Sequence, residues 1–276
     1  MSTYKQLLQT GRELLKQQGI ADADVDAWYL LAHVFRIKRT DLLLKGDLPV
    51  EEHLKDQYLQ LLRRRAGHTP LQHITGTQEF MGLEFNVSGD VLVPRQDTEI
   101  LVEELLKVCE NKSVLDMCTG SGCIIISLAK LGELSRAVGV DLSSKALTIA
   151  NGNVLKHKVK VDLIQSDLFE QVKESFDILV SNPPYIPSEE IRDLMPEVRD
   201  YEPLMALDGS EDGLEFYRRI SHEGMSFLNP GGLIFYEIGH NQGETVKQIL
   251  IEEGFTDVII KKDLSGLDRV VIAKRS

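Results

Sequence analysis

The stretch of the chain with the clearest chemical potential is Ser181-Asn182-Pro183-Pro184-Tyr185, which follows an apolar run at 176–180. The apolar run predicts a buried strand, and the two prolines end it because each lacks an N–H and has a fixed φ. Asn182 precedes a proline, so its backbone is biased towards extended geometry. The resulting stiff loop offers an amide side chain, backbone carbonyls and an aromatic ring. It could hold a planar –NH2 group by accepting both N–H bonds, although a rigid turn without a ligand explains this stretch alone equally well.

Aspartates end three earlier strand-like runs in the same way. Asp116, Asp141 and Asp167 each follow an apolar run, as Asn182 does. Helical segments lie between these runs, and alternating strands and helices imply a parallel sheet with helices on both faces. Ligands in such open α/β sheets lie beyond the carboxyl ends of the strands. We therefore expect the four side chains to border one pocket.

The turn after the first of these strands is rich in small residues and reads Asp116-Met117-Cys118-Thr119-Gly120-Ser121-Gly122. Glycines let a backbone approach a ligand closely at a helix start, although they also suit a simple tight turn. The dinucleotide-binding pattern needs a third glycine where this chain has Ile125, and no Walker A sequence occurs. A pyrophosphate ligand is therefore disfavoured.

A nucleoside without phosphates suits the spacing of the strand-end carboxylates. Asp141 lies 21 residues beyond Gly120, where a strand-end carboxylate typically accepts hydrogen bonds from ribose hydroxyls. Asp167, one strand further on, is placed to meet an adenine edge. These expectations fit S-adenosylmethionine, with Asp116 near the sulfonium or the methionine amino group.

The first part of the chain has a different pattern from the rest. Residues 1–75 carry leucines at helical spacing and predict a helical domain. Residues 78–87 alternate like a strand, a turn follows at Ser88-Gly89-Asp90, and 91–93 predicts a return strand. We therefore expect a β-hairpin that links two domains.

The end of the chain breaks the parallel pattern. Strand-like runs at 257–262 and 268–274 are joined only by Asp263-Leu264-Ser265-Gly266, which suits a hairpin. A parallel pair would need a longer crossover, so at least one strand of the sheet is antiparallel.

Two charged segments have more than one interpretation. Arg63-Arg64-Arg65 ends a helix predicted over 51–65. Cations suit the dipole at a helix C-terminus, so a solvated helix end and a contact to an acidic or RNA-bearing partner both stay open. Residues 186–213 are loop-rich and acidic, and they either form a solvated insertion or border a substrate channel.

Composition sets limits on the class of protein. The chain is 42% hydrophobic and 27% charged, which supports a sizeable core, and its formal net charge of −12 argues against broad binding of a phosphate backbone. The three cysteines, at 109, 118 and 123, and the lack of an apolar signal segment or bilayer-length apolar run predict a cytoplasmic protein without membrane contact. No Cys/His grouping has the spacing of a zinc site, so we expect no metal.

The segments DMCTGSG, VGVD, SDLF and NPPY, in this order and spacing, resemble class I S-adenosylmethionine-dependent methyltransferases that modify amino groups. The resemblance implies an α/β, Rossmann-like fold with a mostly parallel seven-stranded sheet and an antiparallel C-terminal strand. It also implies that the NPPY loop accepts an exocyclic or amide –NH2 group. Adenine N6, guanine N2 and a protein glutamine all remain open as acceptors.

Segments throughout the chain are similar to the PrmC/HemK family of peptide chain release factor N5-glutamine methyltransferases. They are 70–76, Glu79-Phe80, 93–99, 196–198, 201–203, 212–214, Phe216-Tyr217, 239–243 and 262–269. Three positions depart from the residues common in that family, namely Gln96, Cys118 and Ser210, and Cys118 is small enough to keep the turn.

This resemblance implies methyl transfer from S-adenosylmethionine to the side-chain amide nitrogen of the glutamine in the GGQ motif of class 1 release factors, which supports translation termination. It implies an N-terminal helical substrate-recognition domain at 1–75, a β-hairpin linker at 76–95 and a methyltransferase domain at 96–276. We expect a monomer without a direct nucleic-acid partner.

The motifs and the resemblance together assign residues to three roles. The expected catalytic residues are Asn182, Pro183 and Tyr185. The expected cofactor-binding residues are Asp116, Cys118, Thr119, Gly120, Ser121, Gly122, Asp141, Asp167, Leu168 and Asn182. The expected substrate-binding residues are Phe80, Arg95, Asn182, Pro183, Pro184 and Tyr185.

Two other functions compete with this expectation. An amino-methyltransferase acting on a nucleic-acid base would use the same loop chemistry, but the net charge of −12 and the lack of a recognisable nucleic-acid module disfavour it. A non-catalytic S-adenosylmethionine-binding protein is the second alternative, and the intact NPPY stretch disfavours it.

Overall fold

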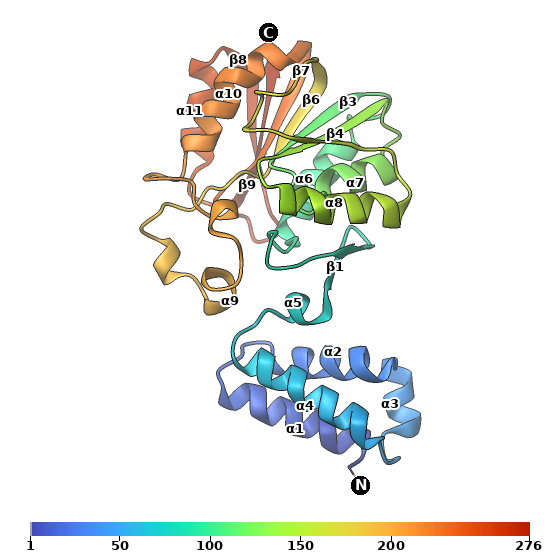
Figure 1. Cartoon of the computed structure of the whole chain (residues 1–276). Coiled ribbons are helices and arrows are strands. Elements are labelled where there is room, and N and C mark those ends of the chain that lie inside the picture. Colours follow the sequence, from blue (N-terminus) through green and yellow to red (C-terminus); the bar gives the residue numbers. More distant parts are fainter. Residues whose placement is uncertain (1) are drawn as a thin grey trace. The chain divides into compact units, whose positions relative to one another are not determined.

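The computed structural model describes residues 2–276, which form two compact units (Figure 1). Unit 1 comprises the chain up to Gly76 together with Met195–Tyr201, and unit 2 comprises Thr77–Leu194 and Glu202–Ser276. The expected division at 75 and 95 differs from this one, because the hairpin belongs to unit 2 and a short later segment belongs to unit 1. We call Met195–Tyr201 the returning segment.

Unit 1 is a small helical bundle built on leucines at helical spacing. The buried side chains at its centre include Leu15, Leu30, Leu31 and Leu62, and the buried hydroxyl of Tyr58 donates to the Ala27 carbonyl over 3.1 Å. The helices are α1 (Tyr4–Gln17), α2 (Ala23–Phe35), α3 (Arg39–Lys45), α4 (Glu52–Ala66), α5 (Leu71–Thr75) and, in the returning segment, α9 (Pro196–Arg199).

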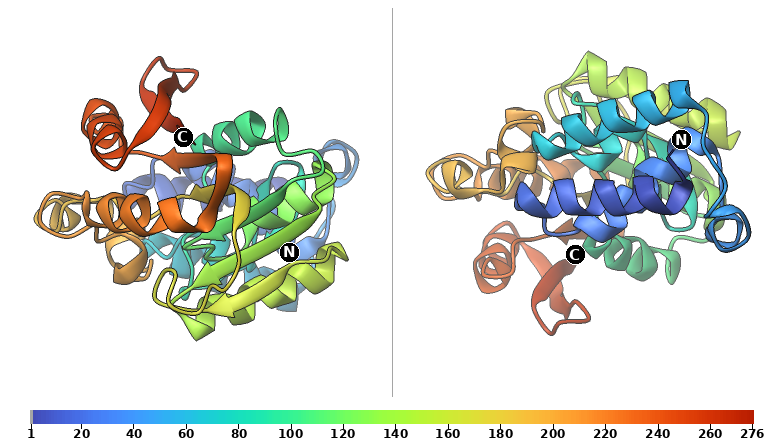
Figure 2. Two further views of the ribbon diagram at one scale, coloured as in Figure 1. Left: turned by 90° about the horizontal axis from the view of Figure 1, so that it is seen from above. Right: turned by 90° about the horizontal axis from the view of Figure 1, so that it is seen from below.

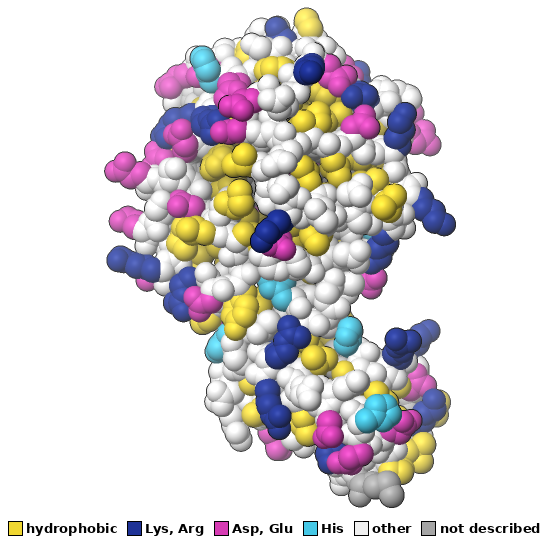
Figure 3. All heavy atoms as spheres, viewed as in Figure 1, with side chains coloured by type: hydrophobic (Ala, Val, Ile, Leu, Met, Phe, Trp, Pro, Cys, Tyr) yellow, Lys and Arg dark blue, Asp and Glu magenta, His cyan; other side chains and the backbone are white. Residues whose placement is uncertain are grey.

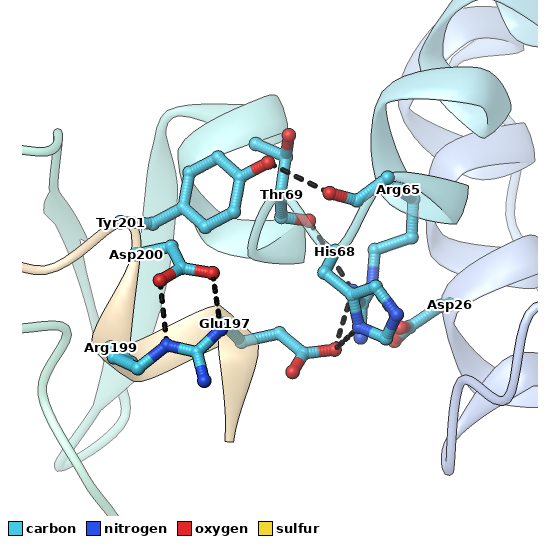
Figure 4. Close-up of polar contacts among 9 residues, drawn as sticks. Asp26, Arg65, His68, Thr69, Glu197, Arg199, Asp200 and Tyr201 are labelled. Atoms are coloured by element: carbon cyan, nitrogen blue, oxygen red, sulfur yellow. Dashed lines mark hydrogen bonds and ion pairs between the residues drawn. The ribbon is translucent and has the colours of Figure 1, made fainter. Parts of the chain in front are cut away.

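Partly buried ion pairs attach the returning segment to the rest of unit 1 (Figure 4). The Arg65 side chain is only 9% exposed, and its Nε lies 2.6 Å from Asp26 Oδ2 while its NH1 lies 3.0 Å from Glu197 Oε1. The Nδ1 atom of His68 lies 2.9 Å from the same Glu197 oxygen, and the Tyr201 hydroxyl donates to the Gly67 carbonyl over 2.7 Å. Arg65 is therefore an internal partner, and not part of a solvated helix end.

Arg65→Met is expected to destabilise unit 1 by about 3–5 kcal/mol, because it leaves the buried Asp26 carboxylate without its charged partner. Trp28 is the only tryptophan of the chain and is buried in unit 1, so its fluorescence during urea unfolding reports on this unit. Arg63→Met, two residues away and exposed, is the matched control and should change stability by no more than about 0.5 kcal/mol. Equal unfolding midpoints for the two variants would contradict the role given to Arg65.

Unit 2 is organised around a seven-stranded sheet with the strand order β5-β4-β3-β6-β7-β9-β8. The strands are β3 (Ser113–Met117), β4 (Arg136–Asp141), β5 (Asp162–Gln165), β6 (Phe176–Ser181), β7 (Leu228–Glu237), β8 (Phe255–Lys262) and β9 (Asp268–Arg275). β9 pairs antiparallel with both β7 and β8, while the other pairs are parallel. The prediction of a mostly parallel sheet with an antiparallel C-terminal strand is confirmed.

Helices cover both faces of this sheet (Figure 2), and the alternation of side chains along the strands explains why. In β6, Leu179 packs in one cluster with α10 and α11, while Ile178 and Val180 pack in another with α6, α7 and α8. The bounds are α6 (Asp97–Leu106), α7 (Cys123–Leu131), α8 (Ser144–His157), α10 (Glu215–Phe227) and α11 (Gly243–Glu252), with short 3-10 helices at Ile191–Asp193 and Leu204–Ala206.

The hairpin is shorter than the sequence pattern predicted. β1 (Thr77–Phe80) pairs antiparallel with β2 (Leu83–Asn86), so the expected single strand at 78–87 is wrong and 91–93 is not a strand. Met81 and Gly82 form the turn with φ values of 52° and 70°. A two-residue turn with positive φ at both positions matches the twist of a hairpin, and glycine adopts it without strain.

Candidate active site

A cavity of about 560 Å³ lies at the carboxyl end of the sheet in unit 2. β3 has β4 on one side and β6 on the other, so the order of the strands reverses at β3. The cavity lies at this switch point. The turn after β3, the ends of the next strands and the segments 90–98 and 203–210 supply its walls. The predicted site residues among its lining are Arg95, Cys118, Thr119, Gly120, Ser121, Asp141, Asp167, Leu168, Asn182 and Pro184.

Asp141 is fixed at the wall of this cavity by two backbone donors. The Gly120 N–H donates to its Oδ2 and the Ser143 N–H to its Oδ1, each over 2.8 Å. Gly120 has a φ of 56°, a left-handed conformation that favours glycine. Burial raises the pKa of Asp141, and the two N–H donors oppose that rise. The Asp141 carboxylate at the end of β4 therefore holds the turn after β3 in place, and the two together form one wall of the cavity.

Asp116 lies beneath the turn and does not line the cavity. Its carboxylate is fully buried and accepts a 2.6 Å hydrogen bond from the Thr119 hydroxyl, and burial raises its pKa to about 7. The expected place beside a sulfonium or amino group is therefore not supported, because Asp116 belongs to the last buried residues of β3. Gly122 also lies off the cavity and precedes α7 as its N-cap residue, with a φ of 79°.

Asp167 and Leu168 border the cavity beyond β5. Arg219 NH2 lies 2.9 Å from Asp167 Oδ1, so this carboxylate is already paired with a cation on α10. Leu168 has a φ of 45° and contributes an apolar wall. Cys118 also lines the cavity, and burial raises the pKa of its thiol. The thiol therefore stays protonated, and we assign it no nucleophilic role.

The NPPY loop leaves β6 directly at the cavity. The Ser181 hydroxyl donates to the Met117 carbonyl over 2.6 Å and ties the loop to β3. Asn182 and Pro184 line the cavity, whereas Pro183 and Tyr185 are not part of its lining. Tyr185 packs against the core, and burial raises its pKa to about 12. A contact between the Tyr185 ring and a substrate amide therefore stays a prediction.

The two substrate residues expected outside the loop differ in their placement. Phe80 is 1% exposed, packs against Phe85 with ring centroids 6.1 Å apart, and presents no surface to the cavity. A direct substrate contact by Phe80 is not supported by this placement. Arg95 lines the cavity, and its NH2 lies 2.6 Å from Oε1 of the buried Glu202.

Thr98 lines the cavity and Glu237 lies next to Asn182, and neither is among the predicted site residues. Glu237 is the last residue of β7 and is 2% exposed, and the pairing of Ser181 with Tyr236 places it beside Asn182. Thr98 is buried in α6, lines the cavity, and accepts from Asn182 Nδ2 over 3.4 Å. The strand-end rule that selected the aspartates would also have selected Glu237, whereas the signal for Thr98 is its place in the segment 93–99, which resembles the PrmC/HemK family.

Two further features of the described residues concern metal binding and membrane crossing. Within residues 2–276, no three or more His, Cys, Asp or Glu side chains are grouped so that they could hold a metal ion. Among the helices described, none combines the length and the apolar character that a membrane crossing requires.

Comparisons with known proteins cover nearly the whole chain. Residues 6–76 match the PrmC N-terminal domain family, and residues 95–196 match the methyltransferase small domain family. The release factor glutamine methyltransferase of Geobacter sulfurreducens is 42% identical over 271 residues, covering 98% of this chain and 95% of that protein. The release factor glutamine methyltransferase of Clostridium botulinum is 41% identical over 279 residues, covering 98% and 99%.

A solved structure shows the same fold at lower identity. The T. thermophilus 16S rRNA N2 G1207 methyltransferase, in complex with AdoMet and guanosine, matches with a TM-score of 0.54 and 19% identity, over 72% of this chain and 50% of that one. The fold and the cavity at the switch point are those of a methyltransferase, and the identity of 41–42% with the two bacterial proteins extends over 98% of this chain. This chain belongs to the family of release factor glutamine methyltransferases.

Proposed function

We propose that this chain methylates the side-chain amide nitrogen of the glutamine in the GGQ motif of class 1 release factors, with S-adenosylmethionine as the methyl donor. One observation carries the proposal, namely that Asp141 and Asn182 line the same cavity. A carboxylate suited to ribose hydroxyls and an amide suited to an –NH2 group thus face a shared space. Membership in the family supplies the identity of the acceptor.

The donor half of the cavity suits S-adenosylmethionine. A volume of about 560 Å³ lies in the range of small-molecule sites. Val91, Leu142 and Leu168 supply apolar walls for a flat base, and Asp141 supplies a carboxylate that backbone N–H groups hold in place. When bound, S-adenosylmethionine supplies a methyl group on a positively charged sulfur.

The acceptor half of the cavity is proposed to position the amide nitrogen. An amide nitrogen is a poor nucleophile because its lone pair is delocalised into the carbonyl. The Asn182 Oδ1 atom and the Pro183 carbonyl would accept its two N–H bonds and favour positive charge on it. Orientation of this kind contributes roughly 7–11 kcal/mol in well-positioned reactions. The nitrogen would gain the methyl group as the carbon–sulfur bond of the donor breaks, with the bonding electrons kept by the sulfur. It would then lose a proton to water, so no strong base is needed.

The expectations about substrate recognition, oligomeric state, cellular location and nucleic-acid contact remain proposals. We propose that unit 1 recognises the release factor, and that the enzyme acts as a monomer in the cytoplasm without direct contact to nucleic acid. On the face drawn in Figure 3, Lys and Arg side chains are interspersed with Asp and Glu, which disfavours broad phosphate binding there.

Incubation with labelled S-adenosylmethionine and a purified class 1 release factor tests the proposal. We expect one methyl group per release factor, and mass mapping should place it on the GGQ glutamine. A release factor with that glutamine replaced by alanine is the control and should remain unlabelled. Label in added RNA or DNA, with none in the release factor, would instead support base methylation.

A further inference from the structure

The NPPY loop depends on its two ends for its orientation. Its consecutive prolines, Pro183 and Pro184, carry no backbone N–H and hold φ at about −65°, so the middle of the loop is stiff. At the start of the loop, the Ser181 hydroxyl donates to the Met117 carbonyl over 2.6 Å. The direction in which Asn182 and the Pro183 carbonyl face therefore also depends on what holds the other end, at Tyr185.

The side chain of Gln242, the residue before α11, holds this other end. Its Nε2 atom donates to the Tyr185 carbonyl over 2.9 Å and to the Gly213 carbonyl over 3.3 Å. Its Oε1 atom accepts from the Gly239 N–H over 2.9 Å. The amide orientation is fixed, because only the nitrogen can donate to two carbonyls and only the oxygen can accept an N–H. Gln242 is 8% exposed, so these hydrogen bonds are shielded from water.

Two glycines allow a close approach to the Tyr185 backbone. A Cβ atom on Gly209 would lie 2.8 Å from Tyr185 Cα, and one on Gly213 would collide with the Tyr185 carbonyl oxygen. The next residue, Ile186, is held separately, because its N–H donates to the Leu207 carbonyl and its carbonyl accepts from the Gly209 N–H. Gln242 is thus the side chain that binds Tyr185 itself, within a space that larger residues would fill.

We propose that Gln242 is a positioning residue for methyl transfer, which fixes the end of the NPPY loop so that Asn182 Oδ1 and the Pro183 carbonyl face the acceptor nitrogen. This inference rests on the proposed function and concerns what holds its acceptor geometry. Gln242 does not line the cavity, so it acts through the loop. The two prolines transmit a shift of Tyr185 to the acceptor groups, because their φ angles cannot absorb it.

A purely structural role is the alternative, and Asn153 in α8 provides the comparison for it. Asn153 is fully buried, and its Nδ2 atom donates to the carbonyls of Asn86 and Ser121 over 3.0 and 2.9 Å. Its Oδ1 atom accepts from the Asn86 N–H over 2.8 Å. Gln242 and Asn153 thus make the same kinds of hydrogen bond, but those of Asn153 do not reach the NPPY loop.

Gln242→Met tests the proposal because it removes both polar ends of the side chain at nearly unchanged length. We expect kcat for methylation of the release factor to fall about 10- to 100-fold, as misplaced reacting groups cause, with KM and S-adenosylmethionine affinity changed by less than about twofold. Single-turnover kinetics and titration calorimetry measure these quantities separately.

Asn153→Leu is the matched control, since it makes the equivalent change at the comparison residue. It should lower the melting temperature to a similar extent as Gln242→Met. At saturating S-adenosylmethionine, however, its kcat should stay within about twofold of wild type, because the acceptor groups are not displaced. A merely structural role for Gln242 predicts the same kcat for both variants.

Gly209→Ala supplies a second variant that leaves the Gln242 side chain intact. The added methyl group would meet the Tyr185 backbone at 2.8 Å, so the loop can no longer keep its position, and kcat should fall about 10-fold. Gly152→Ala is its control and should behave as wild type, because a Cβ atom at this position of α8 would meet open space.

The outcomes separate this inference from the proposed function. If the wild-type enzyme does not methylate a release factor, the proposed function fails and this inference fails with it. If the wild type is active and Gln242→Met keeps the wild-type kcat, or loses no more of it than Asn153→Leu does, Gln242 is not a positioning residue. Should Gln242→Met fail to fold, a wild-type kcat for Gly209→Ala would show that the end of the loop does not set the rate.

Discussion

Asn182→Ala is expected to lower kcat for release factor methylation by about 10²- to 10³-fold, the loss typical when one preorganised polar group is removed from a reacting centre. The alanine removes the Oδ1 acceptor, and the substrate amide then keeps only the backbone carbonyl partner. S-adenosylmethionine affinity should change little, because the carboxylate of Asp141 lies on a different strand end.

Single-turnover kinetics with labelled S-adenosylmethionine separate this loss from slow product release. Asn151→Ala, an exposed asparagine of α8, is the matched control and should retain wild-type kcat. A wild-type methylation rate for Asn182→Ala would show that the loop does not position the acceptor through this side chain.

Asp141→Ala has the second largest expected effect and should weaken S-adenosylmethionine binding about 10- to 100-fold, the range for hydrogen bonds to a charged group. The substitution removes the proposed acceptor for the ribose hydroxyls and also frees the Gly120 and Ser143 N–H groups that hold the turn. At saturating cofactor, kcat should recover, because the NPPY loop is unchanged. This pattern is the reverse of that expected for Asn182→Ala.

Titration calorimetry measures the change in affinity directly. Asp162→Asn, an exposed acidic residue on β5, controls for the loss of one negative charge in unit 2. Wild-type affinity in Asp141→Ala would remove Asp141 from the cofactor site, and a lowered melting temperature with normal affinity would show that its role is to support the turn.

The strand-end rule predicted which side chains border one cavity for three of its four residues. Asp141, Asp167 and Asn182 come together around one cavity because parallel strands place their carboxyl ends on one side. The rule failed for Asp116, because one more residue of β3 follows it and its side chain points under the turn. Apolar patterns show where a strand lies, but they do not show which of its last residues faces solvent.

The sequence pattern does not predict contacts between residues that are far apart in the chain. Glu197 is 132 residues from Arg65, and neither residue carries a local signal that it pairs with the other. The hairpin turn at Met81-Gly82 was missed for a different reason, since alternation continues across a two-residue turn and reads as one long strand.

The returning segment also has a consequence for the order of folding during synthesis. Domains at the N-terminus generally fold first as a chain emerges from the ribosome. Here α1 to α5 emerge early, and Asp26 can then pair with Arg65. Glu197 and Tyr201 are synthesised later, after strands β3 to β6 of the sheet. Unit 1 therefore acquires its last ion pair and its last hydrogen bond only when residue 201 has left the ribosome. A nascent chain stopped before residue 195 should hold the helical unit in a less stable, unfinished state.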